Sequence, residues 1–162
     1  MAGSDLAEPD RSISRLADAL RQHTGNGCFA CGLDNPIGLH VDNFRYEADQ
    51  VVASFVPRSS LQGTVGNLHG GISATALDEI MVWAGILQED VLSVTGKMEL
   101  RYHRPVGVSD EIELRGRVEE RRGSRLRIIG TLGVRDQPVA VSGKGLYLVS
   151  HQMADLIAEA SR

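Results

Sequence analysis

The sequence contains few aromatic residues, two cysteines and no excess of basic charge, and each shortage excludes a class of protein. Phe, Trp and Tyr make up 4% of the 162 residues, too few for an aromatic platform that stacks nucleic-acid bases. A net charge of −4 argues against nucleic acid as the main partner, since phosphate binding requires a dominant basic surface. Two cysteines without an export signal do not make a disulfide framework.

Targeting segments and common phosphate or nucleophile motifs are also missing. No apolar run reaches the roughly 18 residues of a membrane span. The first stretch, MAGSDLAEPDRSISR, carries acidic residues and no apolar centre, unlike a signal peptide. There is no Walker-type loop, and GISATALD lacks the Gly-x-Ser-x-Gly elbow, which excludes Ser73 as a serine nucleophile. We therefore expect one cytoplasmic domain of ordinary globular composition, without membrane contact.

Hydrophobic periodicity predicts an α+β fold around one buried helix. Residues 69–88, HGGISATALDEIMVWAGILQ, place apolar side chains on nearly every side of a helical wheel, as in a helix buried over most of its surface. Apolar and polar residues alternate from Val94 to His103, which indicates a half-buried strand. Further strands are expected at 110–120, 124–135 and 138–150, with two more around a turn near 47–49. An antiparallel sheet of five to six strands would curl around the helix.

The two ends of the chain are expected to lie outside this main domain. Residues 1–27 form an N-terminal extension with a short amphipathic helix at 10–22, and residues 151–162 form a C-terminal helical tail. The main domain then covers residues 28–150. No internal repeat or low-complexity segment interrupts it.

Two features of the central helix suggest chemistry. The His-Gly-Gly opening lets a substrate approach the backbone closely, where the first turn presents unpaired N–H groups suited to a carbonyl or oxyanion. Asp78 and Glu79 lie mid-helix in apolar surroundings, and they point about 100° apart, so they cannot share one role. Alternatives remain open for each feature: the glycines could form an ordinary loop, and the acids could form a salt bridge at an oligomer interface.

The stretches LQGTVGNLHGGISATALDE and VTGKMELRYHRPV resemble the hotdog-fold acyl-CoA thioesterases of the 4-hydroxybenzoyl-CoA and phenylacetyl-CoA (PaaI-like) superfamily. The most specific element is His-Gly-Gly, an acid nine positions after the histidine, and a strand of the form Thr…Tyr…Arg-Pro. The likeness runs from about residue 28 to 149. It implies a long helix wrapped by a curved sheet, a homodimer or a tetramer of two dimers, and hydrolysis of acyl-CoA without metal or cofactor.

Carried over by position, the resemblance assigns roles to individual residues. The backbone N–H of Gly70 would polarise the thioester carbonyl, and His69 would position that loop or touch the substrate. Asp78 would be the catalytic carboxylate, as general base or nucleophile, with Glu79 as the second candidate. Thr95 would help to hold the water.

The same resemblance places Gly71 and Asn67 at the substrate. Many relatives carry an asparagine six residues before the His-Gly-Gly histidine, whereas this chain has Gly63 there. Asn67 lies closer to the histidine and is not an obvious replacement, so the polar contacts of this loop are left open.

Helix geometry independently favours a site shared between two chains. Gly70 and Asp78 are eight residues apart, or about 12 Å along a helix, whereas a general base must lie roughly 3 Å from the water that it activates. Two antiparallel copies of the helix could bring Gly70 of one chain to Asp78 of the other, and two-fold symmetry would then give two equivalent sites.

Arginines are candidates for the phosphates of CoA, since the guanidinium group suits phosphate geometry. The candidates are Arg101, Arg104, Arg121, Arg122 and Arg125. For each, a solvated surface position is the alternative. For the whole protein, the alternative to a thioesterase is a non-catalytic acyl-CoA-binding protein on the same scaffold.

The motif CFACGLDNPIGLH holds both cysteines, Cys28 and Cys31. A zinc site normally needs four ligands; His23 and His40 could complete the set, although no standard finger has that spacing. A redox dithiol usually lies at a helix N-terminus. Similar motifs in the thioesterase subgroup that this chain resembles look like a structural entry to the sheet, and the resemblance implies the same role here. We expect the cysteines to be small packing groups, and we expect no metal site.

Overall fold

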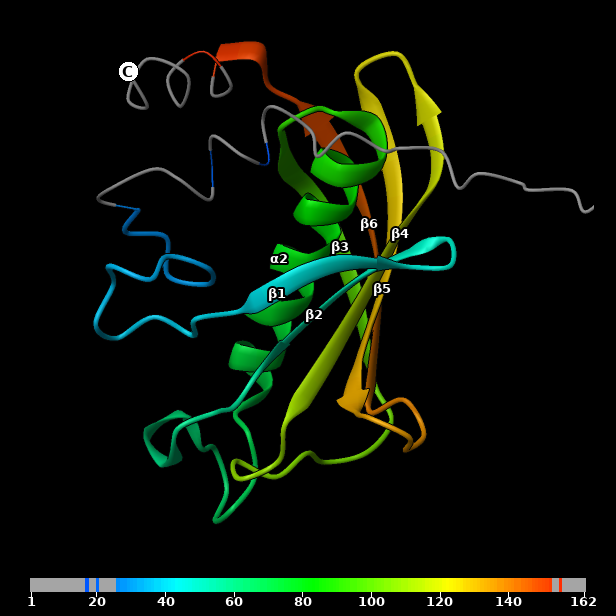
Figure 1. Ribbon diagram of the computed structural model, residues 1–162. Helices are drawn as coiled ribbons and strands as arrows, with labels where there is room; N and C mark the ends of the chain where they lie inside the picture. The colour runs from blue at the N-terminus through cyan, green and yellow to red at the C-terminus, as the bar shows by residue number, and fades with distance from the viewer. Residues whose placement is uncertain (1–16, 18–19, 21–25, 153–154, 156–162) are drawn as a thin grey trace, which may run out of the picture.

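A computed structural model describes residues 17, 20, 26–152 and 155, and within this part of the chain one long helix lies against a six-stranded sheet (Figure 1). The elements are β1 (Asp42–Glu47), β2 (Gln50–Phe55), a 3₁₀ turn (Ser59–Leu61), α2 (Gly70–Glu89), β3 (Ser93–Tyr102), β4 (Ile112–Arg122), β5 (Arg125–Val134) and β6 (Val141–Val149). The α+β prediction is confirmed, and the central helix begins and ends within one residue of its predicted bounds.

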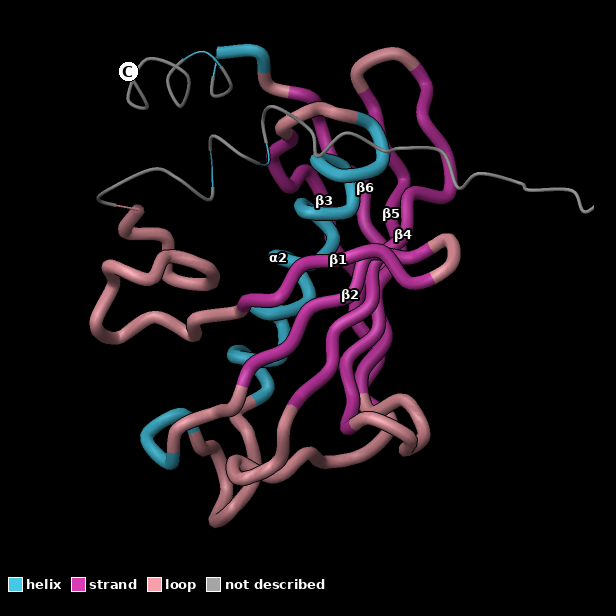
Figure 2. The backbone as a smooth tube through the Cα atoms, viewed as in Figure 1, coloured by secondary structure: helices cyan, strands magenta, loops and turns pink. Residues whose placement is uncertain are grey.

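The sheet is antiparallel throughout, in the order β1-β2-β4-β5-β6-β3. Figure 2 shows α2 on one side of the sheet, with the strands curving past it. The long connection from β2 through α2 carries the chain across the sheet, so that β3 pairs with β6 and forms an edge of the sheet. The predicted helix at 10–22 lies outside the described residues apart from Ala17 and Leu20, which are helical. Of the predicted C-terminal helix, residues 151, 152 and 155 are described and are helical.

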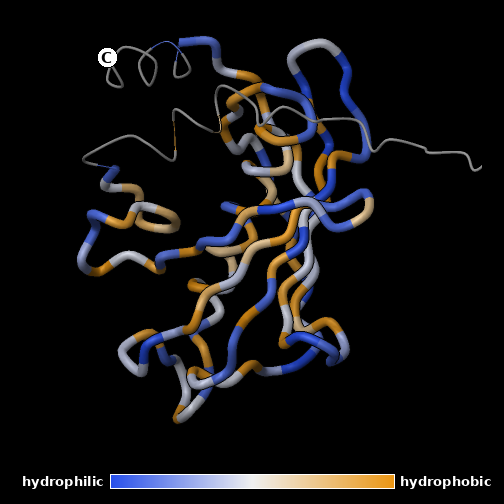
Figure 3. The backbone as a smooth tube through the Cα atoms, in the orientation of Figure 1, coloured by the Kyte–Doolittle hydropathy of each residue, from blue (hydrophilic) through white to orange (hydrophobic). Residues whose placement is uncertain are grey.

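The core forms where α2 meets the concave face of the sheet. Leu77, Ile80 and Met81 on the helix are fully buried against Leu114 and Ile128 of the sheet. Figure 3 shows hydrophobic and hydrophilic residues alternating along the long strands, which is the pattern that predicted them. By length and hydropathy α2 could cross a membrane, but half of that window is buried inside the protein, as expected of a core helix.

A row of three cross-strand glycines lets the helix lie close to the sheet. Gly116 of β4 pairs with Gly130 of β5, which pairs with Gly143 of β6. A Cβ atom on Gly116 would lie 2.6 Å from the Ile80 carbonyl oxygen, and one on Gly130 would lie 3.0 Å from Met81 Cγ. The backbone of α2 therefore rests on a groove that side chains would fill.

Strand β3 departs from the simple alternation expected for it. Ser93 is the one buried residue of its ten, and Val94 and Tyr102 are well exposed. The register with β6 shifts between Thr95 and Lys97, so a β-bulge reverses which side chains face the helix beyond that point. An exposed edge strand with apolar side chains is a surface suited to pairing with another chain.

Candidate active site

At the N-terminus of α2, one backbone N–H group has no acceptor among the residues that the structure describes. His69 is the N-cap, and its Nδ1 accepts a hydrogen bond from the Gly71 N–H at 2.9 Å. The N–H groups of Ile72 and Ser73 donate to the His69 carbonyl. The Gly70 N–H has no acceptor among the described residues. Of the four N–H groups at positions 70–73, that of Gly70 is therefore the one available to a ligand.

Tyr102 fixes the orientation of the Gly70 peptide. Its hydroxyl donates to the Gly70 carbonyl oxygen over 2.8 Å, and its ring lies next to the Gly70 Cα, where an added Cβ would be 3.5 Å from the ring. The preceding loop packs tightly as well, because a Cβ on Gly63 would lie 3.2 Å from the His69 Cα. The glycine at position 63 thus leaves room for His69 and contributes no polar side chain.

The Asp78 carboxylate is held by two hydroxyl groups from different strands. Asp78 Oδ1 accepts hydrogen bonds from Thr95 Oγ1 at 2.7 Å and from the Tyr147 hydroxyl at 2.9 Å. Asp78 Oδ2 has no hydrogen-bond partner among the described residues. Burial, and then the charge of Asp78, raise the pKa of Tyr147, so its hydroxyl remains a donor. The carboxylate is oriented through one oxygen and open through the other.

The bulge in β3 is what brings Thr95 to Asp78. The Tyr147 hydroxyl lies 2.9 Å from Asp78 Oδ1 and 3.9 Å from Met98 Sδ, so Thr95 and Met98 reach the same small region from one strand. Residues three apart in a regular strand point to opposite faces. The extra residue, Gly96, restores them to the same face.

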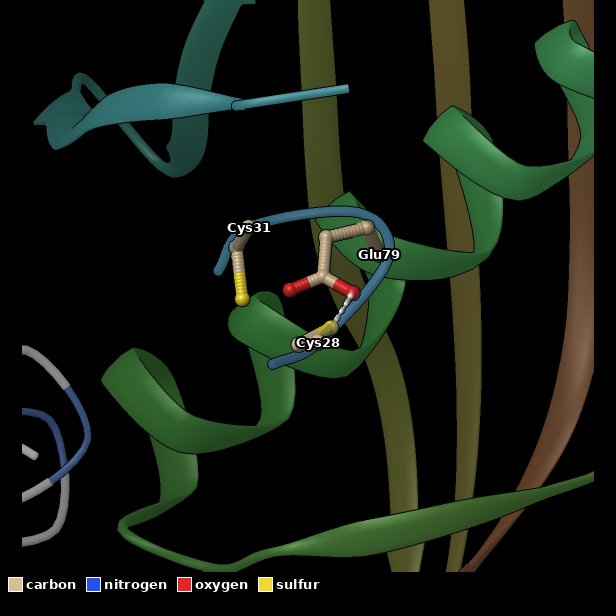
Figure 4. A group of neighbouring side chains, drawn as sticks. All are labelled: Cys28, Cys31 and Glu79. Atoms are coloured by element: carbon tan, nitrogen blue, oxygen red, sulfur yellow. Dashed lines mark hydrogen bonds between the residues drawn. The ribbon is translucent and has the colours of Figure 1, made fainter. Parts of the chain in front are cut away.

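Glu79 serves different neighbours from Asp78. Glu79 Oε1 accepts a hydrogen bond from the Trp83 indole N–H at 2.8 Å, and Glu79 Oε2 lies 3.9 Å from Cys28 Sγ. Figure 4 shows this carboxylate beside the loop of Cys28 and Cys31. Burial, and then the charge of Cys28, raise the pKa of Glu79 to about 7. Asp78 therefore faces β3 and β6, whereas the next residue, Glu79, faces the N-terminal lead-in.

The two cysteines differ in environment. Cys31 is half-buried and packs against the core, as expected, whereas Cys28 is exposed. The hydrogen bond from the Cys31 thiol, aided by neighbouring backbone N–H groups, lowers the pKa of Cys28 to about 5. The same contact raises the pKa of Cys31. The packing role expected from the sequence describes Cys31 and does not describe Cys28.

The other residues predicted at the substrate are dispersed. The Asn67 side chain donates to Thr64 Oγ1 at 3.3 Å within its own loop, and Gly71 is exposed in the first helical turn. Arg121 pairs with Glu89 at the end of α2. The remaining arginines are exposed, and Arg122 pairs with Glu120, whereas Arg101, Arg104 and Arg125 form no ion pair with any described residue.

Sequence reasoning missed Tyr147, Trp83 and the approach of Glu79 to the cysteines. Tyr147 lies in a run of apolar strand residues, where nothing distinguishes a buried hydroxyl with a partner from an ordinary core aromatic. Its alternation with exposed Leu146 and Leu148 is the signal that would have placed its side chain on the helix side of the sheet. Tyr102 is part of the quoted strand motif, but the motif does not indicate its contact with Gly70.

The chain resembles known proteins in sequence and in fold. Residues 65–132 match the family model described as the thioesterase superfamily. A sequence search of curated proteins returns no significant match. Among solved structures, RHA08564, a thioesterase superfamily protein, is 26% identical with a TM-score of 0.67. That alignment covers 75% of this chain and 62% of the other, so the chain spans less than two thirds of that protein.

Two more distant structures share the fold. The PaaI protein of E. coli, from the phenylacetic acid degradation operon, is 14% identical with a TM-score of 0.63, over 69% of this chain and 80% of PaaI. Thioesterase superfamily member 2 of zebrafish is 18% identical with a TM-score of 0.63, over 74% of this chain and 87% of that one. The architecture is thus the hotdog fold, a long helix held in a curved antiparallel sheet. The chain therefore resembles the thioesterase superfamily, through the family model that matches residues 65–132 and through its fold.

Proposed function

We propose that the protein is an acyl-CoA thioesterase that hydrolyses an acyl- or aroyl-CoA to the free acid and CoA. The observation that carries this assignment is the Asp78 carboxylate, oriented through Oδ1 by Thr95 and Tyr147 and left open at Oδ2. A protein that only bound acyl-CoA would have no need of an oriented carboxylate. The free N–H of Gly70 supplies the second requirement, a donor for the carbonyl oxygen.

In the proposed reaction the thioester carbonyl oxygen accepts a hydrogen bond from the Gly70 N–H. This hydrogen bond polarises the carbonyl and stabilises the negative charge that develops on its oxygen. Asp78 Oδ2 takes a proton from water as the water oxygen attacks the carbonyl carbon. The carbon–sulfur bond then breaks, and the CoA thiolate leaves and is protonated. Direct attack by Asp78 on the carbonyl is the alternative, and it would form an anhydride that water then cleaves.

We further propose that each site is built from two chains. Gly70 and Asp78 lie on one uninterrupted helix, about 12 Å apart along its axis, so a single chain does not bring both to one carbonyl. Strand β3 offers an exposed edge next to Asp78 through Thr95. Pairing of two β3 edges about a two-fold axis would set the helices antiparallel and complete two sites.

For the CoA nucleotide we propose the hollow at the β4–β5 turn. Arg122, Arg125 and Arg127 line it together with Leu146, and its volume is about 510 Å³. Three guanidinium groups around one hollow suit phosphate. Glu120 also lines it and pairs with Arg122 and Arg127, so Arg125 is the arginine with the most free charge.

The test of the function is CoA release from a panel of aryl, short-chain and long-chain acyl-CoA substrates, with native protein and with Asp78→Asn. Free CoA should be measured by chromatography, because Cys28 would react with thiol reagents. We expect turnover of at least one thioester and a loss of about 10²-fold or more in Asp78→Asn. Equal turnover by the two proteins would remove Asp78 from the mechanism, and tight binding without turnover would favour a non-catalytic acyl-CoA-binding protein. We also propose that the protein acts in the cytoplasm.

A further inference from the structure

A second cluster of chemically active side chains includes Glu79 and shares no residue with the proposed catalytic site. Cys28 Sγ, Cys31 Sγ and a Glu79 carboxylate oxygen all lie within 4.8 Å of one another (Figure 4). The two cysteines come from the lead-in to the sheet and the glutamate from the middle of α2, 48 residues further along than Cys31. Nothing in the proposed hydrolysis uses these three groups.

The loop that carries the cysteines is shaped around Cys28. Gly32 N–H donates to the Cys28 carbonyl at 3.0 Å, and the backbone N–H groups of Cys31, Ala30 and Gly32 contribute to lowering the pKa of Cys28. A side chain at position 32 is excluded, since a Cβ there would lie 2.3 Å from the Asn26 carbonyl oxygen. A turn that surrounds a sulfur with N–H donors stabilises a thiolate, the form of cysteine that binds metal.

The Glu79 carboxylate is held in place independently of the cysteines. Trp83 donates its indole N–H to Glu79 Oε1 at 2.8 Å, and its ring stacks on Phe44 with centroids 4.1 Å apart. The hydrogen bond occupies one carboxylate oxygen and leaves Oε2 directed at Cys28, 3.9 Å away. An outer residue that orients a ligand in this way is a regular part of metal sites.

We propose that Cys28, Cys31 and Glu79 form a zinc-binding site that joins the lead-in loop to the central helix. Zinc takes thiolate and carboxylate ligands in tetrahedral geometry, with bonds of about 2.3 Å to sulfur and about 2.0–2.2 Å to oxygen. Those bonds set ligand atoms about 3.5–3.8 Å apart, so the observed spacing needs a closure of about 1.3 Å or less. Among the described residues, Cys28, Cys31 and Glu79 are the three that could bind the ion. A water molecule would then be the fourth zinc ligand.

Zinc explains the cluster better than a redox dithiol does. A dithiol that cycles to a disulfide needs two sulfur atoms and gains nothing from a carboxylate directed at them. A carboxylate beside a thiolate in half-buried surroundings is unfavourable unless a cation lies between them. The bound ion would hold Glu79 on the lead-in side and so fix the rotation of α2, with Asp78 facing β3 and β6.

The experiment measures metal in the whole protein, purified in a reducing buffer from cells supplied with zinc. We expect about one zinc per chain by elemental analysis. After removal of metal with a chelator, titration with Co²⁺ should produce thiolate-to-cobalt charge-transfer bands and the intense d–d bands of a tetrahedral site, saturating at one equivalent. These measurements use native protein alone, so they hold even if a variant fails to fold.

Variants then identify the ligands. Cys28→Ser and Cys31→Ser should lose the charge-transfer bands or halve them, and Glu79→Gln should bind Co²⁺ at least about tenfold more weakly. Glu89→Gln is the matched control, since Glu89 lies on the same helix and pairs with Arg121 instead. Zinc should raise the Tm of native protein and of Glu89→Gln, and not that of Cys28→Ser.

Three results would overturn the zinc site. They are zinc-free native protein that gives no cobalt charge-transfer bands, a Cys28–Cys31 disulfide in the protein as isolated, and equal cobalt affinity in Glu79→Gln and Glu89→Gln. All of these readouts are independent of thioester hydrolysis, so failure of the zinc site and failure of the proposed function are distinguishable.

Discussion

The buried hydroxyl of Tyr147 donates a hydrogen bond to Asp78 Oδ1 over 2.9 Å, which ties β6 to the middle of the central helix. Tyr147 is fully buried, and its ring could pack there equally well without the hydroxyl. The hydroxyl therefore has a specific task, to orient the carboxylate together with Thr95. Tyr147 is a positioning residue, because it acts on substrate through Asp78.

Tyr147→Phe should lower kcat by about tenfold and leave KM nearly unchanged, because the carboxylate loses one of its two donors while the substrate contacts remain. The free energy of unfolding should fall by about 1–3 kcal/mol, as for a buried acceptor that loses its donor. Steady-state kinetics and denaturant unfolding measure the two effects.

Tyr46→Phe is the matched control, since the Tyr46 hydroxyl donates to the Leu87 carbonyl near the other end of α2. It should lower stability and leave kcat unchanged. If both variants lose kcat to the same extent, the effect of Tyr147 is a general loss of stability and its positioning role is wrong.

The sequence was sufficient for the fold because the signals that predict it are local. The all-round apolar pattern of residues 69–88 and the alternation of the later strands each depend on a few neighbouring residues. The β3 bulge was not predictable, since one inserted residue changes only which face each side chain occupies. The resemblance to thioesterases pointed to Thr95 as a residue of the site. The structure adds how Thr95 reaches Asp78, which is through the bulge in β3.

Arg122→Ala combined with Arg125→Ala should raise KM for acyl-CoA by about tenfold, because two cations near the proposed phosphate site are lost. The same double variant should hydrolyse an N-acetylcysteamine thioester, which lacks the nucleotide, as the native protein does. Arg135→Ala is the control, since Arg135 pairs with Glu113 away from this hollow. An equal rise in KM for both thioesters would mean that the arginines act on the acyl site or on the fold.

Gly116→Ala should lower the free energy of unfolding by about 1–3 kcal/mol, the range for overpacking a core. The added Cβ would lie 2.6 Å from the Ile80 carbonyl oxygen, and backbone cannot move aside as a side chain can. Gly133→Ala, also in the sheet, is the control, because its Cβ would meet its nearest neighbour at 3.4 Å. Urea unfolding measures the stability of both variants. Equal free energies of unfolding for Gly116→Ala and Gly133→Ala would show that α2 is free to shift on the sheet.

Cys28 in reduced, metal-free protein should react with iodoacetamide at a rate that changes little between pH 8 and pH 6. The thiolate is the reacting form, and its pKa of about 5 keeps it populated over that range. Cys31, with a raised pKa, should remain unmodified in mass spectrometry of the peptides. In Cys31→Ala the midpoint for Cys28 should move upward, since the hydrogen bond from Cys31 is the largest cause of the lowered pKa. A rate for Cys28 in native protein that falls about tenfold per pH unit below pH 8, as for an ordinary thiol, would contradict this.

The cluster of Cys28, Cys31 and Glu79 could not be predicted from the sequence. The spacing of the cysteines was visible, but their third neighbour lies on a different element far along the chain. Only tertiary packing, through Trp83 and the lead-in loop, brings the carboxylate to the sulfur atoms. In the same way, no local pattern indicates that Tyr102 contacts Gly70 or that Tyr147 contacts Asp78.

The claim that the catalytic site is shared between chains allows a direct test with two inactive variants. Gly70→Pro removes the N–H and adds the pyrrolidine ring. Proline is well tolerated at the first position of a helix, and His69 already has the extended backbone that precedes proline, with ψ of 134°. Gly70→Ala keeps the N–H and is the control. Alone, Gly70→Pro and Asp78→Asn should each be nearly inactive, and Gly70→Ala should be active.

The decisive measurement is CoA release after the Gly70→Pro and Asp78→Asn chains are co-expressed in equal amounts. In a mixed dimer one site carries both substitutions, and the other combines a native Gly70 with a native Asp78. With random pairing, about half of the dimers are mixed, and activity should return to about a quarter of the native value. No activity above that of the separate variants would contradict the shared site and require Gly70 and Asp78 of one chain to act together.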